Sequence, residues 1–376
     1  MASGTARRNK QTGVSIMDNY EQLRLVLDTH PSRAPESPVF DKILRMLFSQ
    51  EDAAIAVHMS FKLKKATEIA LAAGLSPEEA GKRLESMADR VIIFAREKDG
   101  EMLYSLLPTI PGIFEFPFMK GANTPELREI GRLWEEYHAG ALGNAFAGNP
   151  TPGVRVFPLA ESLKGNSSVL AHEEAQAIIA GSEYICLTNC ACRESAGHCD
   201  APRDVCMGFG TGGRFLVDRG YARQISREEA LRVLERAAEA GLVHVTDNHA
   251  GSPGIICNCC PCCCTVLRGR TQLNHPHAVS PSSFAALVDE EKCTACGICS
   301  DERCPVKAIT MAGNAARVDA DACIGCGLCV TACPAEAITM MPRAQAPVIP
   351  ANVKEMGLKI MQEKGILKEF LERGQK

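Results

Sequence analysis

The sequence predicts a multi-domain protein of the α+β class. Its 376 residues are enough for two or three domains, each with its own core. In the first third of the chain, stretches with helical spacing of apolar residues stand beside a strand–turn–strand pattern. All 19 cysteines lie further on, in dense blocks between residues 186 and 333. These blocks indicate at least one more unit with a chemistry of its own.

The first two predicted units are an arm and a helical region. Residues 1–37 are polar and interrupted by prolines, and we expect a flexible arm there with a short helix around Tyr20–Leu27. Residues 38–107 begin with the segment PVFDKILRMLF, in which apolar residues recur at helical spacing. A further helix is expected to end at Gly74, because glycine is the common residue just past a helix. Ser76 and Pro77 then have the residue types of a helix start.

A hairpin follows these helices. Residues 91–94 have the composition of a strand, residues 98–100 that of a tight turn, and residues 102–107 that of a return strand. Helices followed by a hairpin resemble a winged-helix domain. The resemblance implies either a DNA-reading module or a docking and dimerisation module.

Four more units are expected along the chain, and the cysteines occupy two of them. The amphipathic helix and strand in SREEALRVLERAAEAGLVHVTDN belong to the first cysteine-rich unit, which is therefore predicted to be α+β. The tail carries an amphipathic helix that should dock on another part of the protein. The expected bounds are a mostly helical connector at residues 108–180, a cysteine-rich domain at 181–280, a second cysteine block at 284–341 and the tail at 342–376.

The composition of the chain argues against several classes of binding partner and against a place in the membrane. The formal net charge is −4 and aromatic residues make up 5% of the chain, which favours neither a nucleic-acid nor an anionic-membrane partner. We expect no membrane span, because no stretch approaches 18 uncharged apolar residues. The N-terminus lacks the pattern of a secretory signal, and a cytoplasmic location is expected. In a reducing compartment, an odd number of clustered cysteines indicates metal or redox chemistry rather than disulfides.

The second cysteine block contains an internal repeat. CTACGICSDERCP begins at Cys293 and CIGCGLCVTACP begins at Cys323, with three cysteines at the same spacing and a closing Cys-Pro in each. Two residues between thiolates let a tight loop wrap one corner of an iron–sulfur cube, and the glycines let backbone N–H groups approach the sulfurs. Zinc sites instead favour two separated Cys-x-x-Cys pairs. The pattern therefore favours iron–sulfur clusters over zinc.

These motifs resemble the bacterial ferredoxins that carry two 4Fe–4S clusters. In that family the fourth cysteine of each run crosses to the other cluster. The resemblance implies one cluster held by Cys293, Cys296, Cys299 and Cys333. It implies a second cluster held by Cys323, Cys326, Cys329 and Cys304. The first run departs from the family pattern, with four residues instead of three before its Cys-Pro, and this should bulge one loop without abolishing ligation.

Eleven cysteines remain upstream, in two groups. Because neighbouring residues of an extended chain point to opposite sides, the run ICNCCPCCC should face two clusters or share one with the first group. One or two further 4Fe–4S clusters are the preferred interpretation; zinc, free thiols or a labile disulfide are the alternatives. One cluster is expected to bind Cys190, Cys192, Cys199 and Cys206. The other would choose among Cys257, Cys259, Cys260, Cys262, Cys263 and Cys264.

Two other motifs are not supported. Cys186, Cys190 and Cys192 are one residue short of the cysteine run of radical SAM enzymes. The glycines in GFGTGG, residues 208–213, match a dinucleotide-binding pattern, but we expect no strand–turn–helix unit around them. The chain as a whole resembles multi-cluster iron–sulfur proteins of anaerobic bacteria, through CRESAGHC, EEALRVLERAAEAGLVH and ICNCCPCCC.

The charge of the winged-helix-like region bears on its role. Residues 38–107 carry ten basic and eleven acidic side chains, whereas a DNA reader needs a basic surface. The candidate recognition helix also contains four acidic residues. Partner docking, or a homodimer formed through this unit, is therefore favoured over DNA binding.

The sequence predicts an electron-transfer protein that passes low-potential electrons to or from a partner oxidoreductase through several 4Fe–4S clusters. No acid–base pair or nucleophile pattern indicates a stand-alone enzyme. Two alternatives stay open: a redox-responsive winged-helix regulator, and a reductase subunit with an active-site cluster.

Overall fold

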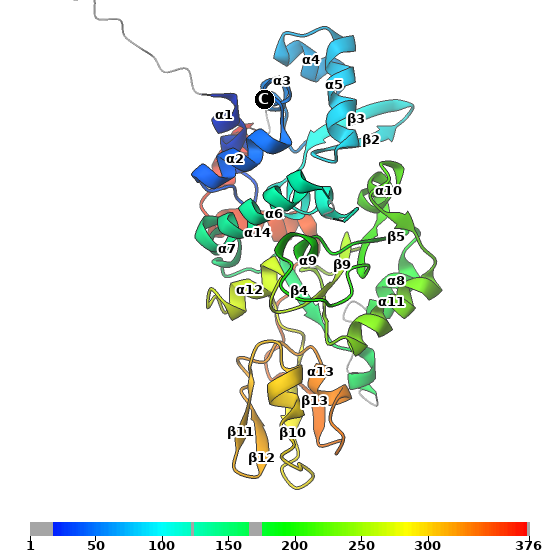
Figure 1. Ribbon diagram of the computed structural model, residues 1–376, viewed down its shortest axis with the longest axis vertical. Coiled ribbons are helices and arrows are strands. Elements are labelled where there is room, and N and C mark those ends of the chain that lie inside the picture. Colours follow the sequence, from blue (N-terminus) through cyan, green and yellow to red (C-terminus); the bar gives the residue numbers. More distant parts are fainter. Residues whose placement is uncertain (1–17, 122–123, 165–174, 374–376) are drawn as a thin grey trace, which may run out of the picture.

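The computed structural model describes residues 18–121, 124–164 and 175–373. These residues form an elongated molecule (Figure 1). A unit of helices with a small sheet lies at one end, a six-stranded sheet in the middle, and two short strand pairs at the other end. Helices and antiparallel strands in separate units agree with the predicted α+β class.

The N-terminal unit contains most of the helices expected there. Ser76 begins one of them, because its side chain accepts a hydrogen bond from the backbone N–H of Glu79 at 3.2 Å, and Pro77 is its first residue. Three strands pair in the antiparallel order β1-β3-β2. The helices are α1 (Asn19–Leu27), α2 (Pro38–Leu47), α3 (Gln50–Ala56), α4 (Ala66–Ala73) and α5 (Pro77–Asp89). The strands are β1 (Lys64–Lys65), β2 (Ile93–Lys98) and β3 (Glu101–Leu106).

Part of the predicted flexible arm is instead packed into this unit. Asp18 caps α1, and Leu23 and Leu27 of that helix are buried in the same core as Phe40 and Leu44. The short helix expected around Tyr20–Leu27 is present as α1, and the residues from 18 onward that form it are packed rather than flexible. The rest of the arm, residues 1–17, lies outside the described residues.

The connector extends the N-terminal core. Its main helix, α6 (Pro125–Tyr137), places Trp134 and Tyr137 in that core, where the Tyr137 ring stacks on Phe40 with 4.6 Å between ring centroids. A short helix, α7 (Gly143–Ala147), follows. Near the end of the connector, helix α8 (Ala175–Gly181) is described from residue 175 onward.

A six-stranded antiparallel sheet forms the middle domain. The strand order is β4-β8-β9-β6-β5-β7. The amphipathic helix predicted from the sequence is α11 (Arg227–Glu239), which buries Ala230, Val233, Leu234 and Ala237. The strands are β4 (Val154–Phe157), β5 (Ile185–Thr188), β6 (Cys206–Phe209), β7 (Arg223–Gln224), β8 (Val243–Asp247) and β9 (Ile255–Cys259). The other helices are α9 (Ala191–Ala196), α10 (Gly210–Asp218) and α12 (Thr265–Thr271).

The C-terminal domain is built from two strand pairs. Strand β10 (Phe284–Val288) pairs with β13 (Ile338–Pro342), and β11 (Ile309–Ala312) pairs with β12 (Ala315–Val318), both antiparallel. A helical turn lies within each cysteine run: η6 (Cys299–Arg303) in the first and α13 (Leu328–Thr331) in the second. Each turn therefore includes the third cysteine of its run, Cys299 or Cys329.

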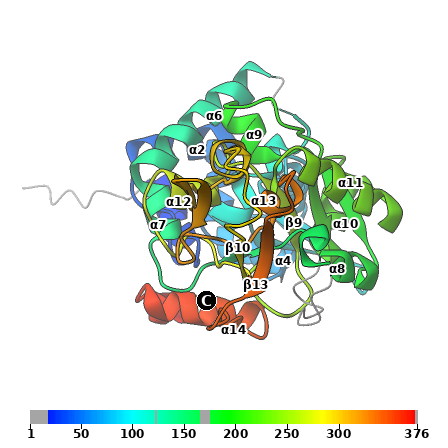
Figure 2. The same ribbon diagram turned by 90° about the horizontal axis from the view of Figure 1, so that it is seen from below.

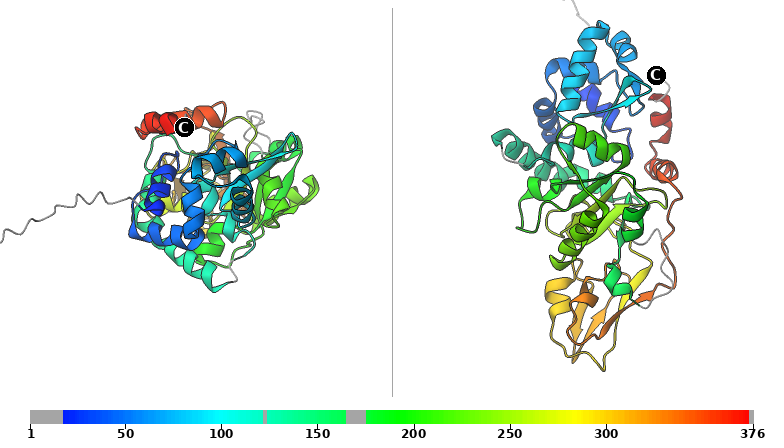
Figure 3. Two further views of the ribbon diagram at one scale, coloured as in Figure 1. Left: turned by 90° about the horizontal axis from the view of Figure 1, so that it is seen from above. Right: turned by 90° about the vertical axis from the view of Figure 1, so that its right-hand side faces the viewer.

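The tail returns along the molecule to the N-terminal half. Its helices are α14 (Val353–Glu363) and α15 (Leu367–Arg373), and Figures 2 and 3 show them along one side of the protein, away from the C-terminal strands. The Lys364 ammonium donates to the backbone oxygens of Pro31 (2.7 Å) and Ala145 (2.8 Å). The Phe370 ring stacks on Phe61. The amphipathic tail thus docks on the arm, the connector and the N-terminal unit of the same chain.

Candidate metal centres

One cavity in the C-terminal domain brings together cysteines of both runs. Burial raises the pKa of Cys326 to about 12, so a metal that binds this thiol has to displace its proton. Most of the remaining cavity wall is apolar and includes Ile309, Ile324 and Met340. The cysteines that line the cavity are Cys304, Cys323, Cys326 and Cys329. This set contains the fourth cysteine of the first run and the three leading cysteines of the second.

The fourth cysteine of each run has the same backbone contact. The Cys304 sulfur accepts a hydrogen bond from the N–H of Ala308 at 3.1 Å, and the Cys333 sulfur accepts one from Ala337 at 3.4 Å. Such N–H···S bonds stabilise the thiolate form that binds iron. The leading cysteines of the first run, Cys293, Cys296 and Cys299, also lie together: burial raises the pKa of Cys299, and the other two add to the shift.

The extra residue of the first run has a visible effect. Cys299–Arg303 forms a π-helical turn, whereas the matching segment of the second run, Leu328–Thr331, is α-helical. A π turn accommodates one more residue than an α turn without breaking the helix. The expected bulge is therefore absorbed within the helical turn, and Cys304 still reaches the cavity.

Two glycines of the second run are required by close packing. Gly325 and Gly327 have φ values of +69° and +79°, which only glycine adopts readily. A Cβ on Gly325 would lie 2.2 Å from the carbonyl oxygen of Phe284, and one on Gly327 would lie 2.2 Å from the hydroxyl of Ser162. These glycines therefore let the cluster-binding loop lie directly against β10 and the segment after β4.

Six thiols of the middle domain form a closed circle, which we call the six-thiol ring. Each thiol lies close enough to two others of the group that their pKa values shift one another. Around the ring the order is Cys190, Cys192, Cys264, Cys259, Cys257 and Cys206. Interactions with Cys206 and Cys259 lower the pKa of Cys257 to about 7, so this thiol loses its proton more readily than an ordinary cysteine.

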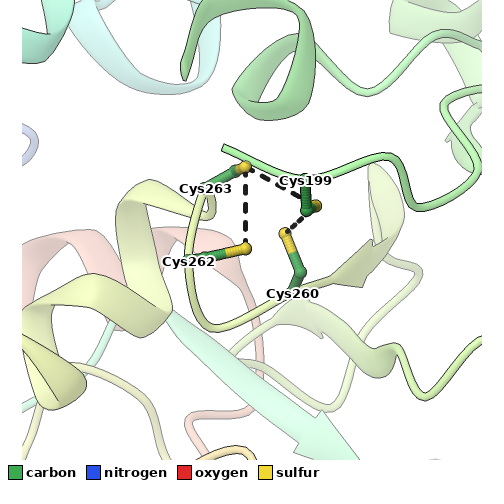
Figure 4. Close-up of side chains that lie close together, drawn as sticks. All are labelled: Cys199, Cys260, Cys262 and Cys263. Carbon is green, nitrogen blue, oxygen red and sulfur yellow. Dashed lines mark hydrogen bonds between the residues drawn. The ribbon is translucent and has the colours of Figure 1, made fainter. Parts of the chain in front are cut away.

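Four other thiols form a second, tighter group, which we call the four-thiol group. Cys199, Cys260, Cys262 and Cys263 place their sulfurs within 4.8 Å of one another, and Figure 4 shows the four side chains pointing to one centre. Three of the sulfur–sulfur distances are 3.8 Å: Cys199–Cys260, Cys199–Cys263 and Cys262–Cys263. The run ICNCCPCCC therefore faces two sites, and the first cysteine group contributes to both.

The structure groups Cys199 differently from the sequence prediction. Cys190, Cys192 and Cys206 lie together in the six-thiol ring, but Cys199 lies with Cys260 in the four-thiol group. The reason is local. Helix α9 ends at Gly197, which has a left-handed φ of +63° and turns the chain away from the ring before Cys199.

The remaining cysteine belongs to a packing contact. Cys186 is fully buried, and a Cβ on Gly208 or Gly213 would lie 3.0 or 3.3 Å from its sulfur. The GFGTGG glycines do join a strand, β6, to a helix, α10, contrary to the expectation. However, β6 pairs only antiparallel with its neighbours β5 and β9, unlike a parallel dinucleotide-binding unit. Cys186 and these glycines thus serve close strand–helix packing.

A buried arginine lies between the two thiol groups. Arg193 has no exposed surface, and its Nη1 donates to the backbone oxygen of Asn258 (3.0 Å) and to the Cys260 sulfur (3.7 Å). Burial alone would lower its pKa, but the negative charge of Cys190 and Cys206 holds the pKa above its ordinary value. Among the described residues, its Nε and Nη2 have no hydrogen-bond partner. A buried cation with unpaired donors fits a site that holds anionic metal–sulfur groups.

The connector also contributes to this region, which sequence reasoning missed. Glu135 of α6 pairs with Arg268 of α12 through two bonds of 2.5 and 2.8 Å. Helix α12 begins directly after Cys264 of the ring. Glu115, which also belongs to the connector, has its pKa raised to about 8, chiefly by desolvation and further by the charge of Cys192. These polar residues stand out only because they are buried, and their burial is known only from the folded structure.

The Glu135–Arg268 ion pair should stabilise the six-thiol ring indirectly, by holding α12 in place directly after Cys264. In the variant Glu135→Ala, Arg268 keeps its charge but loses its partner, and its side chain is buried, with only 4% of its surface exposed. We expect a local loss of about 3 kcal/mol, seen as faster hydrogen exchange in α12. Glu129→Ala is the matched control on the same helix, because its pair with Arg132 is exposed and worth under about 1 kcal/mol. Equal exchange rates in the two variants would contradict this role.

One apolar core joins the middle and C-terminal sites. Cys259 and Cys264 of the six-thiol ring belong to the same cluster of packed buried side chains as Cys326 of the C-terminal cavity. Leu267 and Ile324 are also members of this cluster. The two metal-binding regions are therefore separated by packed protein rather than by a solvent gap.

Comparison with known families identifies the C-terminal domain. Residues 285–334 match the family model of the 4Fe-4S dicluster domain. The chain thus carries an iron–sulfur binding domain of the type used in electron transfer. No curated protein and no solved structure matches the chain. In the described part of the chain, no helix is long and apolar enough to cross a membrane.

Proposed function

We propose that this protein transfers low-potential electrons between a partner oxidoreductase and a chain of iron–sulfur centres. The observation that carries the proposal is the 4Fe-4S dicluster domain at residues 285–334, packed through one apolar core against the six-thiol ring. Clusters held in adjacent packed regions can exchange electrons without a diffusing carrier. The protein supplies ligands, burial and spacing, and the clusters carry the electrons.

Two cubes are assigned to the C-terminal domain. The cavity lined by Cys304, Cys323, Cys326 and Cys329 supports the crossed assignment of the fourth cysteine. The other cube would take Cys293, Cys296, Cys299 and Cys333. The paired N–H···S bonds at Cys304 and Cys333 support equivalent roles for these two residues.

A further iron–sulfur centre is assigned to the six-thiol ring. Its six thiols exceed the four that a single tetrahedral ion binds, which suits a group with several irons. Arg193 offsets the negative charge of such a centre. The ring thus extends the chain of centres into the middle domain.

The N-terminal unit is proposed to be a winged-helix-like docking module. Arg219, in the turn after α10, forms ion pairs with Glu85 and Asp89 of α5, the helix that would have to enter a DNA groove. The Phe94 and Phe215 rings also pack together across the same boundary. These contacts join α5 to the metal-binding domain and favour protein docking over DNA reading. A homodimer through this unit stays a prediction.

Metal analysis tests the proposal. Anaerobically purified full-length protein is expected to contain about eight irons and eight labile sulfides from two cubes, and more from the ring. After reduction, EPR should show cluster signals that disappear on reoxidation. Cys257→Ser should lose the ring's share of iron and keep the signals of the two cubes. Cys186→Ala, outside both thiol groups, is the control and should lose no iron. A colourless protein that holds zinc in place of iron would overturn the proposal.

A further inference from the structure

The four-thiol group differs from the other cysteine sites in its size. Its four sulfurs lie within 4.8 Å of one another, with three pairs at 3.8 Å. A tetrahedral ion with metal–sulfur bonds of about 2.3 Å places its sulfurs about 3.8 Å apart. The thiolates of a cube bind four different irons and therefore stand further apart than those around a single ion. The observed spacing matches one ion.

From this geometry we infer that Cys199, Cys260, Cys262 and Cys263 bind a single tetrahedral divalent ion, zinc in preference to iron, rather than a 4Fe–4S cube. Four thiolates around such an ion are typical of closed structural sites. On binding, the ion replaces the four thiol protons, which pass to solvent, and no oxidation occurs.

A second, independent observation supports an anionic site there. Four thiolates and a divalent ion leave two negative charges, which need compensation in a buried environment. Arg193 supplies it: the guanidinium is fully buried and its Nη1 donates to the Cys260 sulfur. His198 further fixes the loop, because its Nδ1 lies 3.0 Å from the backbone oxygen of Cys262.

The position of the ion gives it a structural role. Cys199 lies on the segment between Cys192 and Cys206 of the six-thiol ring, and Cys260, Cys262 and Cys263 lie between Cys259 and Cys264. The ion therefore ties together the two loops that carry the ring. The inference is separate from the electron-transfer proposal, because a redox-inactive ion here would leave the cubes able to exchange electrons.

The test compares Cys262→Ser with the control Cys186→Ala in full-length, anaerobically purified protein. Zinc, iron and labile sulfide are measured per chain. We expect Cys262→Ser to lose about one metal ion with no change in sulfide, and Cys186→Ala to lose nothing. A parallel loss of about four irons and four sulfides would show a cube and overturn the inference. EPR of the reduced C-terminal clusters, recorded on the same samples, reports separately on the electron-transfer proposal.

A measurement on the wild-type protein keeps the inference testable if the variant fails to fold. Zinc-edge X-ray absorption should show four sulfurs at about 2.3 Å and no neighbouring metal. If zinc is absent and the iron content per chain exceeds the labile sulfide content by one, the single ion is iron. This result would uphold the single-ion site and overturn its preference for zinc. If zinc is absent and sulfide accounts for every iron, the site does not hold a single ion and the inference is wrong.

Discussion

Replacing Arg193 by methionine is expected to empty the six-thiol ring of iron while the two C-terminal cubes remain. Methionine keeps much of the side-chain volume but removes the buried positive charge that faces Cys190, Cys206 and Cys260. Removing one partner of a buried charge pair costs about 3–5 kcal/mol, which is enough to shift cluster binding by more than a hundredfold. Iron and labile sulfide per chain, with EPR of the reduced protein, measure the loss.

Arg203→Met is the matched control for this experiment. Arg203 lies in the same region and pairs with Glu194 at 3.4 Å, but 36% of its side chain is exposed. Its loss should cost under about 1 kcal/mol and leave the iron content unchanged. If Arg193→Met kept all of its iron, charge compensation by this arginine would be refuted.

Gly325→Ala is expected to disrupt the C-terminal cluster site. The new Cβ would lie 2.1 Å from the hydroxyl oxygen of Ser282 and 2.2 Å from the carbonyl oxygen of Phe284, and φ is +69°. The carbonyl belongs to the first residue of β10 and cannot rotate away. Strain in φ and overpacking together should cost about 2–5 kcal/mol, seen as a lower unfolding temperature and loss of iron from the cavity of Cys326.

A second glycine in the same domain separates backbone strain from the clash. Gly313, in the turn between β11 and β12, also has a positive φ, +64°, but a Cβ there would have nothing within 4 Å. Gly313→Ala should therefore cost only about 1–2 kcal/mol and retain its iron. Equal losses in the two variants would show that the close approach to β10 is not what requires glycine at residue 325.

The C-terminal site was predictable because its ligands are local. The spacing after Cys293 and Cys323 places three cysteines on one short loop, so each repeat indicates its own site before any tertiary contact is known. The family match covers the same segment. The one-residue insertion before Cys304 was visible in the sequence, but the π turn that absorbs it was not.

The middle sites were only partly predictable because their ligands meet through tertiary structure. Strand alternation agrees with the grouping at β9, where Cys257 and Cys259 enter the ring and the next residue, Cys260, enters the other group. It does not extend to the following turn, where the adjacent Cys262 and Cys263 both enter the four-thiol group. Proximity in sequence suggested that Cys199 joins Cys192, but the turn at Gly197 separates them. That turn depends on a left-handed backbone conformation whose direction the sequence does not specify.

The alternation of ligands along ICNCCPCCC has a consequence for how the protein is assembled in the cell. Metal bound at either of the two proposed sites would immobilise the loop that supplies the remaining thiols of the other site. Whichever proposed site is filled first would bear part of the ordering entropy of the other, so its occupancy would favour filling of the second site without being required for it. When metal is scarce, molecules with both sites filled would then be more frequent than independent filling of the two sites would give.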